Sequence, residues 1–571
     1  MHIVLDGMIV AGHYWRIILL VLVLTLGFGG LLINNLPQAH RQDWLFFPLS
    51  LPLGVIALSL LSFALLLLAR IFPDTLIVSS WLLFGLGAIL FGFHLRRRSD
   101  LRSNALYLIA FSVLLITRLA FLKNMLMPPY SDSPEHYMIV QDFLAPNSAP
   151  ASFYSIIGHY YHFGFHSFTA WMSILSGLGT PLLLALLGQV FLVITPFSVF
   201  ALVGGITKDK TAAWIAFLLA GFGWQMPAFA VNWGKYPAVA SIAVFPALLA
   251  VLYFLGHKQQ KISKKIFLLG IVLVAGATFL HTRILICITV VILSHYLTLQ
   301  LTDKLMAQNK ITKMVLLAGS ILFIFWFHWE IFFQGYYSNY FGILIGTALL
   351  LPFAFHFFPS LTLIAIIYLL GIGFTTELSA PTILQNYSSR LLDRTFVQTS
   401  LFLPLAILGS LGISGLAKAL IDKKLLRQGV ITSIILLLLL NATQLSYYPD
   451  PCCGYVRDQD IAAYNWINLN VPSDAVFFIP GLRVSDRLLG TDAGIWIQPL
   501  TGRKTKKRPF DISWLAPDVT ADICQFESVY IYIGGGQFGF SLSKEIEIST
   551  RYQKVFSRED VSIYSINCSD H

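Results

Sequence analysis

The chain has 571 residues, of which 56% are hydrophobic and only 12% are charged. A typical soluble domain carries about 25% charged residues, so a soluble protein of this composition would lack the polar side chains that hydrate its surface. The basic residues behind the net charge of +10 lie in short clusters between apolar runs, which argues against a nucleic-acid binder. The composition therefore predicts a polytopic membrane protein.

Apolar runs of about 17–25 residues, the length that crosses a bilayer as a helix, recur along the chain. About 14 spans are expected, at 15–34, 46–70, 76–95, 105–122, 182–204, 211–231, 236–255, 265–281, 283–299, 312–331, 339–357, 361–377, 399–419 and 429–446. The polar stretch 281–283 predicts a tight turn, because one helix of 35 residues would run about 52 Å, too far for one crossing. The first three spans, within 1–104, form an N-terminal module, and 105–446 form the core.

The Lys and Arg residues predict which loops face the cytoplasm, because cytoplasmic loops are enriched in them. If the Arg-rich loop 94–103 is cytoplasmic, alternation of the spans gives the same side to the basic loops 205–210, 256–265, 300–313 and 418–428. The outer side then holds two large segments, which are the loop 123–181 and the C-terminal stretch 447–571.

The stretch 447–571 has the pattern of a small soluble α/β domain of about 125 residues. A helix is expected at 461–468, strands at 475–479, 529–533 and 561–566, and a turn at 534–536. Four cysteines would face an oxidising compartment, so one or two disulfides are expected. A bond between the adjacent Cys452 and Cys453 is not expected.

The outer loop after the span 105–122 carries two carboxylates and an imidazole, Asp132, Glu135 and His136. If a helix begins after Ser133, with Pro134 at its first position, Asp132 lies just outside the helix and Glu135 in its first turn. Such groups can abstract a hydroxyl proton or hold a divalent cation such as Mg²⁺ or Mn²⁺. Helix capping in an exposed loop is the alternative.

Two histidines further along this loop, His162 and His166, are spaced i, i+4 and would share one face of a helix. No third ligand follows at a spacing typical of zinc sites. We therefore favour an interfacial amphipathic helix with His and Tyr at headgroup level, which could still line a substrate site.

Later outer loops contribute cations and polar groups. They comprise Lys235 in the first, His281 and Arg283 in the second, and Tyr387, Arg390 and Arg394 in the third. Cations on the outer side are unusual, because Lys and Arg are enriched in cytoplasmic loops. We expect them to bind phosphate, which Arg can contact through two N–H groups at once and Lys through a single charge. We favour Arg394 and Lys235. A headgroup anchor or an ion pair with Asp393 is the alternative.

The order of these features resembles the GT-C class of integral-membrane glycosyltransferases. The segment 130–137 stands where that class has an acidic motif after a transmembrane helix, and 154–178 matches its interfacial helices. The tail is similar to the C-terminal domains of large bacterial members. The resemblance covers 105–571, although Asp132-Ser133-Pro134-Glu135 replaces the paired Asp-x-Asp form.

The resemblance implies transfer of a sugar from a polyprenyl-phosphate donor to a glycan, lipid or protein acceptor at the outer face of the plasma (inner) membrane. Asp132, and after it Glu135, would take the acceptor proton, and the outer cations or a divalent cation would stabilise the leaving phosphate. One alternative is a transporter or flippase of a lipid-linked saccharide, which predicts charged residues inside spans. The other is a non-catalytic membrane scaffold, in which the outer carboxylates are dispensable.

Overall fold

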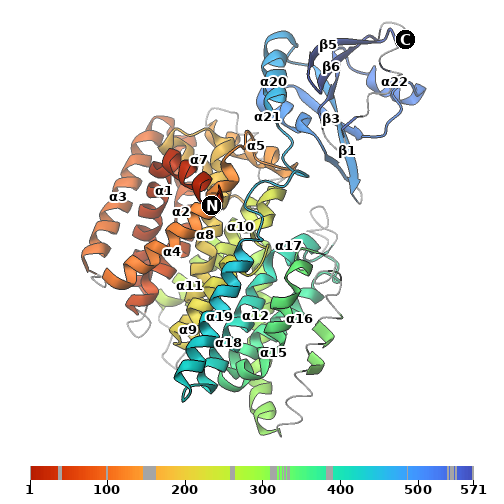
Figure 1. The fold of residues 1–571 in the computed structure, drawn as a ribbon. Coiled ribbons are helices and arrows are strands. Elements are labelled where there is room, and N and C mark those ends of the chain that lie inside the picture. Colours follow the sequence, from red (N-terminus) through yellow and green to blue (C-terminus); the bar gives the residue numbers. More distant parts are fainter. Residues whose placement is uncertain are drawn as a thin grey trace.

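The computed structural model of the protein (Figure 1) describes most of the chain. The described residues are 2–36, 42–97, 101–145, 162–256, 264–308, 318–320, 322–324, 326, 330, 335–380, 390–484, 487–535, 539–540, 546 and 549–568. The predicted span 312–331 lies largely outside them, and Tyr387 lies outside them altogether.

The larger part of the molecule is a bundle of apolar helices. In chain order these are α1 (His2–Asn34), α2 (Asp43–Ile71), α3 (Leu76–Arg97), α4 (Leu101–Leu119), α8 (Thr180–Thr207), α9 (Lys210–Phe222), α10 (Tyr236–Gly256), α11 (Lys264–Leu280), α12 (Arg283–Ala307), α15 (Phe341–Phe357), α16 (Pro359–Phe374), α17 (Arg394–Ser400), α18 (Phe402–Ala419) and α19 (Lys424–Ala442). Each predicted span except 312–331 overlaps one of these helices.

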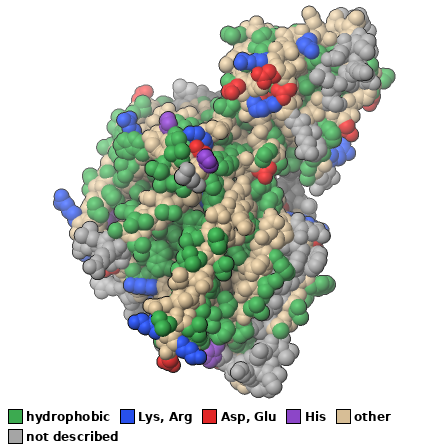
Figure 2. All heavy atoms as spheres, in the orientation of Figure 1, with side chains coloured by type: hydrophobic (Ala, Val, Ile, Leu, Met, Phe, Trp, Pro, Cys, Tyr) green, Lys and Arg blue, Asp and Glu red, His purple; other side chains and the backbone are tan. Residues whose placement is uncertain are grey.

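Ten helices in the described part of the chain are long and apolar enough to cross a membrane, and three shorter apolar helices accompany them. Figure 2 shows that the side chains on the flank of the bundle are mostly hydrophobic, while charged groups gather toward its ends and on the C-terminal domain. An apolar flank of this size is typical of a surface covered by lipid. The chain is therefore a multi-pass membrane protein, and the total of about 14 spans stays a prediction.

Two breaks between helices determine where the polar loops lie. The chain turns between α11 and α12 at His281-Thr282, as predicted. The expected span 211–231 is wrong in length, because α9 ends at Phe222 and the chain continues to a short 3-10 helix, η4 (Ala228–Trp233). Gly223 and Pro227 explain this end, since glycine weakens a helix and proline donates no backbone hydrogen bond.

The helices of the predicted N-terminal module share the core of the rest of the bundle. Residues of α1 and α2 belong to the same cluster of buried side chains as α8 and α10. Phe63 of α2 packs edge-on against Phe279 of α11, with ring centroids 4.8 Å apart. The boundary near residue 104 therefore does not correspond to a separate packing unit.

Polar contacts divide the loops between the two ends of the bundle. At the end that carries the C-terminal domain (Figure 1), here the domain end, Lys123 pairs with Asp6. At the opposite end, Lys418 pairs with Asp209, their atoms 3.0 Å apart. These pairs join loops that the alternation of spans places on the same side. Which end faces the cytoplasm stays a prediction from the Lys and Arg distribution.

The C-terminal domain is a small α/β unit. Its elements are α20 (Asp458–Asn470), β1 (Val476–Val484), β2 (Arg487–Gly490), α21 (Ile497–Thr501), β3 (Lys504–Pro509), α22 (Pro517–Ile523), β4 (Val529–Ile533), β5 (Tyr552–Arg558) and β6 (Val561–Ile566). The strands lie in the order β2-β1-β4-β6-β5, with β3 also paired to β1. Strands β3 and β4 run parallel to β1, whereas β2, β6 and β5 pair antiparallel to their neighbours. The predicted helix and strands are confirmed.

Two disulfides are present in the C-terminal stretch. Cys524 is bonded to Cys568, which ties the end of α22 to the chain after β6. Cys452 is bonded to Cys453, so the expectation that these neighbours do not pair is wrong. The turn in which they lie brings both sulfur atoms to one side, which sequence adjacency alone does not reveal.

Candidate active site at the domain end

The acidic motif forms the first turn of α5 (Asp132–Leu144), which begins two residues earlier than expected. Asp132 is therefore the first residue of the helix rather than a residue outside it, and the Ser131 side chain makes no cap hydrogen bond. Inside this turn the Ser133 hydroxyl donates to the carbonyl of Pro129. Pro134 is tolerated because the first turn of a helix does not need its missing N–H.

Asp132 forms an ion pair with Lys235, which follows η4. The Lys235 Nζ lies 2.5 Å from Asp132 Oδ2. Both side chains are accessible, with exposed fractions of 25% for Asp132 and 34% for Lys235. Gly234 allows this approach, because its φ of +64° favours glycine and a Cβ there would lie 2.7 Å from Ser133 Oγ.

The charge of Lys235 depends on two carboxylates. Burial on its own would lower the pKa of Lys235, but the ion pair and hydrogen bond with Asp132 outweigh burial and raise it. Asp393 raises the pKa further, and Arg283 opposes that effect. Lys235 therefore lies within electrostatic range of a second ion pair.

That second pair joins Arg283, at the start of α12, to Asp393, just before α17. Asp393 also caps α17, because its Oδ1 accepts the backbone N–H of Phe396 at 2.7 Å. The Arg283 guanidinium lies over the Phe396 ring, 5.7 Å from its centroid, and its side chain is only 17% exposed. These contacts fix a cation between two helix ends.

Four buried histidines are here called the histidine cluster: His136, His162, His166 and His281. His136, His162 and His281 lie within electrostatic range of the cations of the two ion pairs. His136 Nδ1 and His166 Nε2 lie 3.0 Å apart. The rings of His162 and His281 lie 4.5 Å apart between centroids, and His281 stacks on Phe396 at 5.2 Å. The cluster thus connects α5 with the turn before α12.

Burial keeps the histidine cluster uncharged at neutral pH. It lowers the pKa of His136 to about 3, with a further lowering by Lys235 and an opposing hydrogen bond to the Gly234 backbone. Burial also holds the pKa values of His162, His166 and His281 well below the ordinary value. Neutral imidazoles can donate and accept protons in one chain of contacts.

The predicted placement of His162 and His166 on one exposed helix face differs from the structure. The helix α7 (Gly164–Ser176) begins after His162, so only His166 is helical, and it is fully buried. The helix α7 packs against α2, α5 and α8, and its position at headgroup level stays a prediction. Phe165 and Phe168 explain this packing, because each buries a large apolar ring.

Glu135, Arg390 and Arg394 form none of the contacts described above. Glu135 is exposed. Arg390 donates to the backbone carbonyl of Glu377 at 2.8 Å, and Arg394 pairs with Glu330 through side chains that are 49% and 63% exposed. Of the cations predicted to bind phosphate, the structure thus brings Lys235 and Arg283 together and places Arg390 and Arg394 in exposed contacts.

The side chains predicted to hold a divalent cation do not converge. Asp132 pairs with Lys235, His136 faces His166, and Glu135 is exposed. Among the described residues, no group of three or more His, Cys, Asp or Glu side chains is arranged to hold a metal ion. Asp132, Glu135 and His136 are thus not arranged as one metal site in this structure, and the use of a divalent cation stays a prediction.

One feature of the centre was not predicted. His136 was expected to be a possible ligand beside Asp132, whereas it forms one end of the histidine cluster. An ion pair between an outer cation and Asp393 was the predicted alternative to phosphate binding, and Arg283 forms it. Asp393 also caps α17.

No family model and no curated protein matches the chain.

Proposed function

We propose that the protein is a membrane glycosyltransferase that moves a sugar from a polyprenyl-phosphate donor to an acceptor hydroxyl at the domain end. One observation carries the proposal: an accessible carboxylate, Asp132, is held by Lys235 within electrostatic range of Arg283. A base and two cations in one place are what this reaction needs, because a proton must leave the acceptor while negative charge grows on the departing phosphate.

The residues suggest a sequence of events. Lys235 binds Asp132 Oδ2, so we expect Oδ1 to take the acceptor proton. The acceptor oxygen then bonds to the anomeric carbon of the sugar as the bond from that carbon to the phosphate oxygen breaks. Protonation neutralises Asp132 and releases the charge of Lys235 toward the leaving phosphate, beside Arg283.

An apolar groove supports a lipid-linked donor. A cavity of ≈ 750 Å³ lies along α10, α11 and α12, and its lining includes Thr282. Thr282 directly precedes Arg283, so a chain lying in this groove would place a phosphate near the cations. A second apolar cavity, of ≈ 290 Å³, lies among α8, α10, α12, α16 and α18.

One observation favours the second candidate, a non-catalytic membrane scaffold. Arg283 and Arg394 each already have a carboxylate partner, which satisfies their charge without a ligand. On that hypothesis Asp132 and Lys235 would only join α5 to the loop before α10. The two candidates therefore differ in what loss of the Asp132 carboxylate does to a folded protein.

The test is the Asp132→Asn variant, purified and reconstituted in liposomes. We expect sugar transfer to fall by at least about 10²-fold, the scale of a lost general base, with little change in thermal unfolding. The assay follows the loss of labelled sugar from a panel of polyprenyl-phosphate hexoses and pentoses, with cell-envelope glycans as acceptor.

Glu135→Gln is the matched control, because it removes a carboxylate from the same helix turn at an exposed position. We expect transfer within a few-fold of the unmodified protein. Near-normal transfer by folded Asp132→Asn protein would remove Asp132 as the base and favour the scaffold.

A further inference from the structure

The linker between α19 and α20, residues 443–457, contacts several loops at the domain end. Tyr447 packs against the buried Arg118 of α4, whose guanidinium lies 5.3 Å from the ring centroid. The Tyr448 hydroxyl donates to Asp6 of α1 at 2.8 Å. The linker is thus held to the bundle before it reaches the C-terminal domain.

A turn within this linker contacts both loops that form the central ion pair. The backbone N–H of Tyr130 donates to the carbonyl of Cys453 at 2.9 Å, two residues before Asp132. The backbone N–H of Asp450 donates to Oδ1 of Asn232 at 2.8 Å, three residues before Lys235. One short turn therefore joins the carboxylate loop to the lysine loop.

The turn is built from Asp450 and closed by a disulfide. Asp450 accepts the N–H of Cys452 through Oδ1 at 2.9 Å and the N–H of Cys453 through its carbonyl at 3.0 Å. Cys452 is exposed, whereas Cys453 is buried. The Cys452–Cys453 bond thus joins an exposed residue to a buried one and lies beside the carbonyl that accepts the Tyr130 N–H.

Tyr130 requires an external partner to hold its backbone. Its φ of +68° is a left-handed conformation that L side chains rarely adopt, because the Cβ atom then crowds the following carbonyl oxygen. A hydrogen bond from the Tyr130 N–H offsets part of the cost of this crowding. The conformation aims the chain from Tyr130 into α5, and so sets where Asp132 begins the helix.

We propose that the turn 450–454 is a thiol-sensitive clamp that positions Asp132 against Lys235. Its residues are positioning residues, because they act through the two loops. With the disulfide closed, Cys453 and Asp450 hold both loops in register; with it open, the turn relaxes and the ion pair loosens. The effect on sugar transfer rests on the proposed function, whereas the effect on the loops does not.

The opening step needs a dithiol reductant. A thiolate of the reagent attacks Sγ of the exposed Cys452, the bond to Sγ of Cys453 breaks, and Cys453 takes a proton. The second thiol of the reagent then attacks the mixed disulfide and releases Cys452 as a thiol. The reagent ends as a disulfide, having supplied two electrons, and oxidation reverses the sequence.

The test measures hydrogen exchange of the Tyr130 amide and sugar transfer, with and without dithiothreitol, in the full-length protein. We expect the dithiol to speed exchange at Tyr130 by about 10-fold and to lower kcat by about 10-fold with the donor KM unchanged, because displacement by about 1 Å at the reacting centre can cost that much or more. Reoxidation should restore both values, which a folding defect would not allow.

Paired variants separate the two disulfides. The Cys524→Ser/Cys568→Ser protein should respond to the dithiol like the unmodified protein, whereas Cys452→Ser/Cys453→Ser should exchange fast at Tyr130 without the reagent and not respond to it. No change at Tyr130 on reduction, or a response that depends on Cys524 and Cys568, would overturn the clamp. A response at Tyr130 in a protein that transfers no sugar would support the clamp and count against the proposed function.

Discussion

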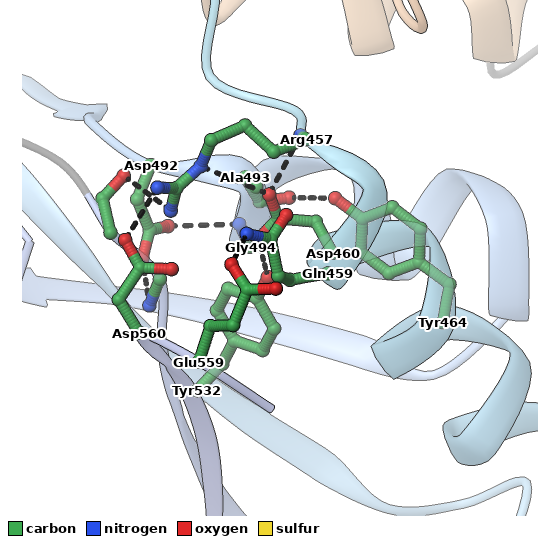
Figure 3. A network of polar contacts seen from close by, with 12 residues as sticks. Arg457, Gln459, Asp460, Tyr464, Asp492, Ala493, Gly494, Tyr532, Glu559 and Asp560 are labelled. Atoms are coloured by element: carbon green, nitrogen blue, oxygen red, sulfur yellow. Dashed lines mark hydrogen bonds and ion pairs between the residues drawn. The ribbon is translucent and has the colours of Figure 1, made fainter. Parts of the chain in front are cut away.

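Two sets of carboxylates in this protein are held in opposite ways. In the C-terminal domain, Asp460 and Asp492 are fully buried, and each accepts two hydrogen bonds (Figure 3). Asp460 accepts from the Tyr532 hydroxyl and the Arg457 N–H, and Asp492 accepts from the N–H groups of Gly494 and Gly534. The contact of Asp460 with Tyr532 joins α20 to β4, and that of Asp492 with Gly534 joins the loop after β2 to the loop after β4. Carboxylates buried in this way are out of reach of a substrate.

Asp132 differs in that a quarter of its side chain is exposed and its partner is the partly exposed Lys235. Ion pairs that water reaches contribute little to stability, about 0–1 kcal/mol when fully exposed, so a ligand can replace either partner more readily than in the buried set. A carboxylate that holds the fold together and one that can react with a substrate therefore differ in how exposed the side chain is, not in residue type. Three measurements test this difference, beginning with the one expected to show the largest effect.

The two regions should respond to pH with opposite signs. Burial raises the pKa of Asp492 from 3.8 to about 7, despite the two backbone donors. Its folded pKa is above the unfolded value, so its contribution to stability is present below pH 4 and lost as the pH rises toward 7. The pKa of His136 is lowered to about 3, so the histidine cluster loses stability as the pH falls below 6.5.

Thermal unfolding between pH 4 and 8, with each region followed by mass-spectrometric labelling, measures both responses. Each pKa unit corresponds to about 1.4 kcal/mol, so shifts of several units should be visible. Asp492→Asn, which mimics the neutral carboxyl, should flatten the response of the domain alone. If both regions lost stability in the same direction of pH change, the predicted difference between them would be wrong.

Removing a buried, hydrogen-bonded carboxylate should destabilise the C-terminal domain. Asp460→Ala leaves the buried Tyr532 hydroxyl without its acceptor, which costs about 1–3 kcal/mol. We expect a lower melting temperature of the C-terminal domain by differential scanning calorimetry. Asp132→Ala, the matched change at the exposed ion pair, should shift the melting temperature by much less. Equal shifts would show that Asp132 is as structural as Asp460.

Two arginines should also differ in their effect on sugar transfer according to how exposed they are. Arg283 is mostly buried and stacks on Phe396, so Arg283→Lys should lower transfer by about 10-fold through loss of the planar fork. Arg394 is half exposed, so Arg394→Lys should leave both transfer and stability near those of the unmodified protein. Initial rates at saturating donor provide the comparison. A larger loss of transfer in Arg394→Lys than in Arg283→Lys would instead indicate that Arg394 belongs to the site.

The sequence predicts those parts of the fold that depend on local pattern. Apolar runs predict the helices, and the polar break at His281-Thr282 predicts the turn before α12. The strand β3 was not predicted, because its sequence Lys504–Pro509 is strongly basic and carries no apolar alternation. Its lysines suit the outer strand of a sheet, where they discourage pairing with another chain.

For the site, the sequence predicts which types of residue are present but not which of them contact one another. Outward cations and an acidic loop indicate a phosphate-handling centre, but their partners depend on tertiary packing. Nothing in the spacing of His136 and His281 indicates that they lie in one cluster. Likewise the left-handed backbone of Tyr130 has no sequence signal, since tyrosine rarely adopts it.

The contact between Tyr448 and Asp6 spans 442 positions of sequence and has a consequence for biosynthesis. A ribosome delivers α1 first, and the carboxylate and lysine loops long before residues 450–453. During that interval the two loops have no clamp and α1 has no contact with the linker. The turn 450–454 can therefore join the carboxylate and lysine loops only after α1 to α19 have been made, and a chain that stalls after α18 would lack this contact.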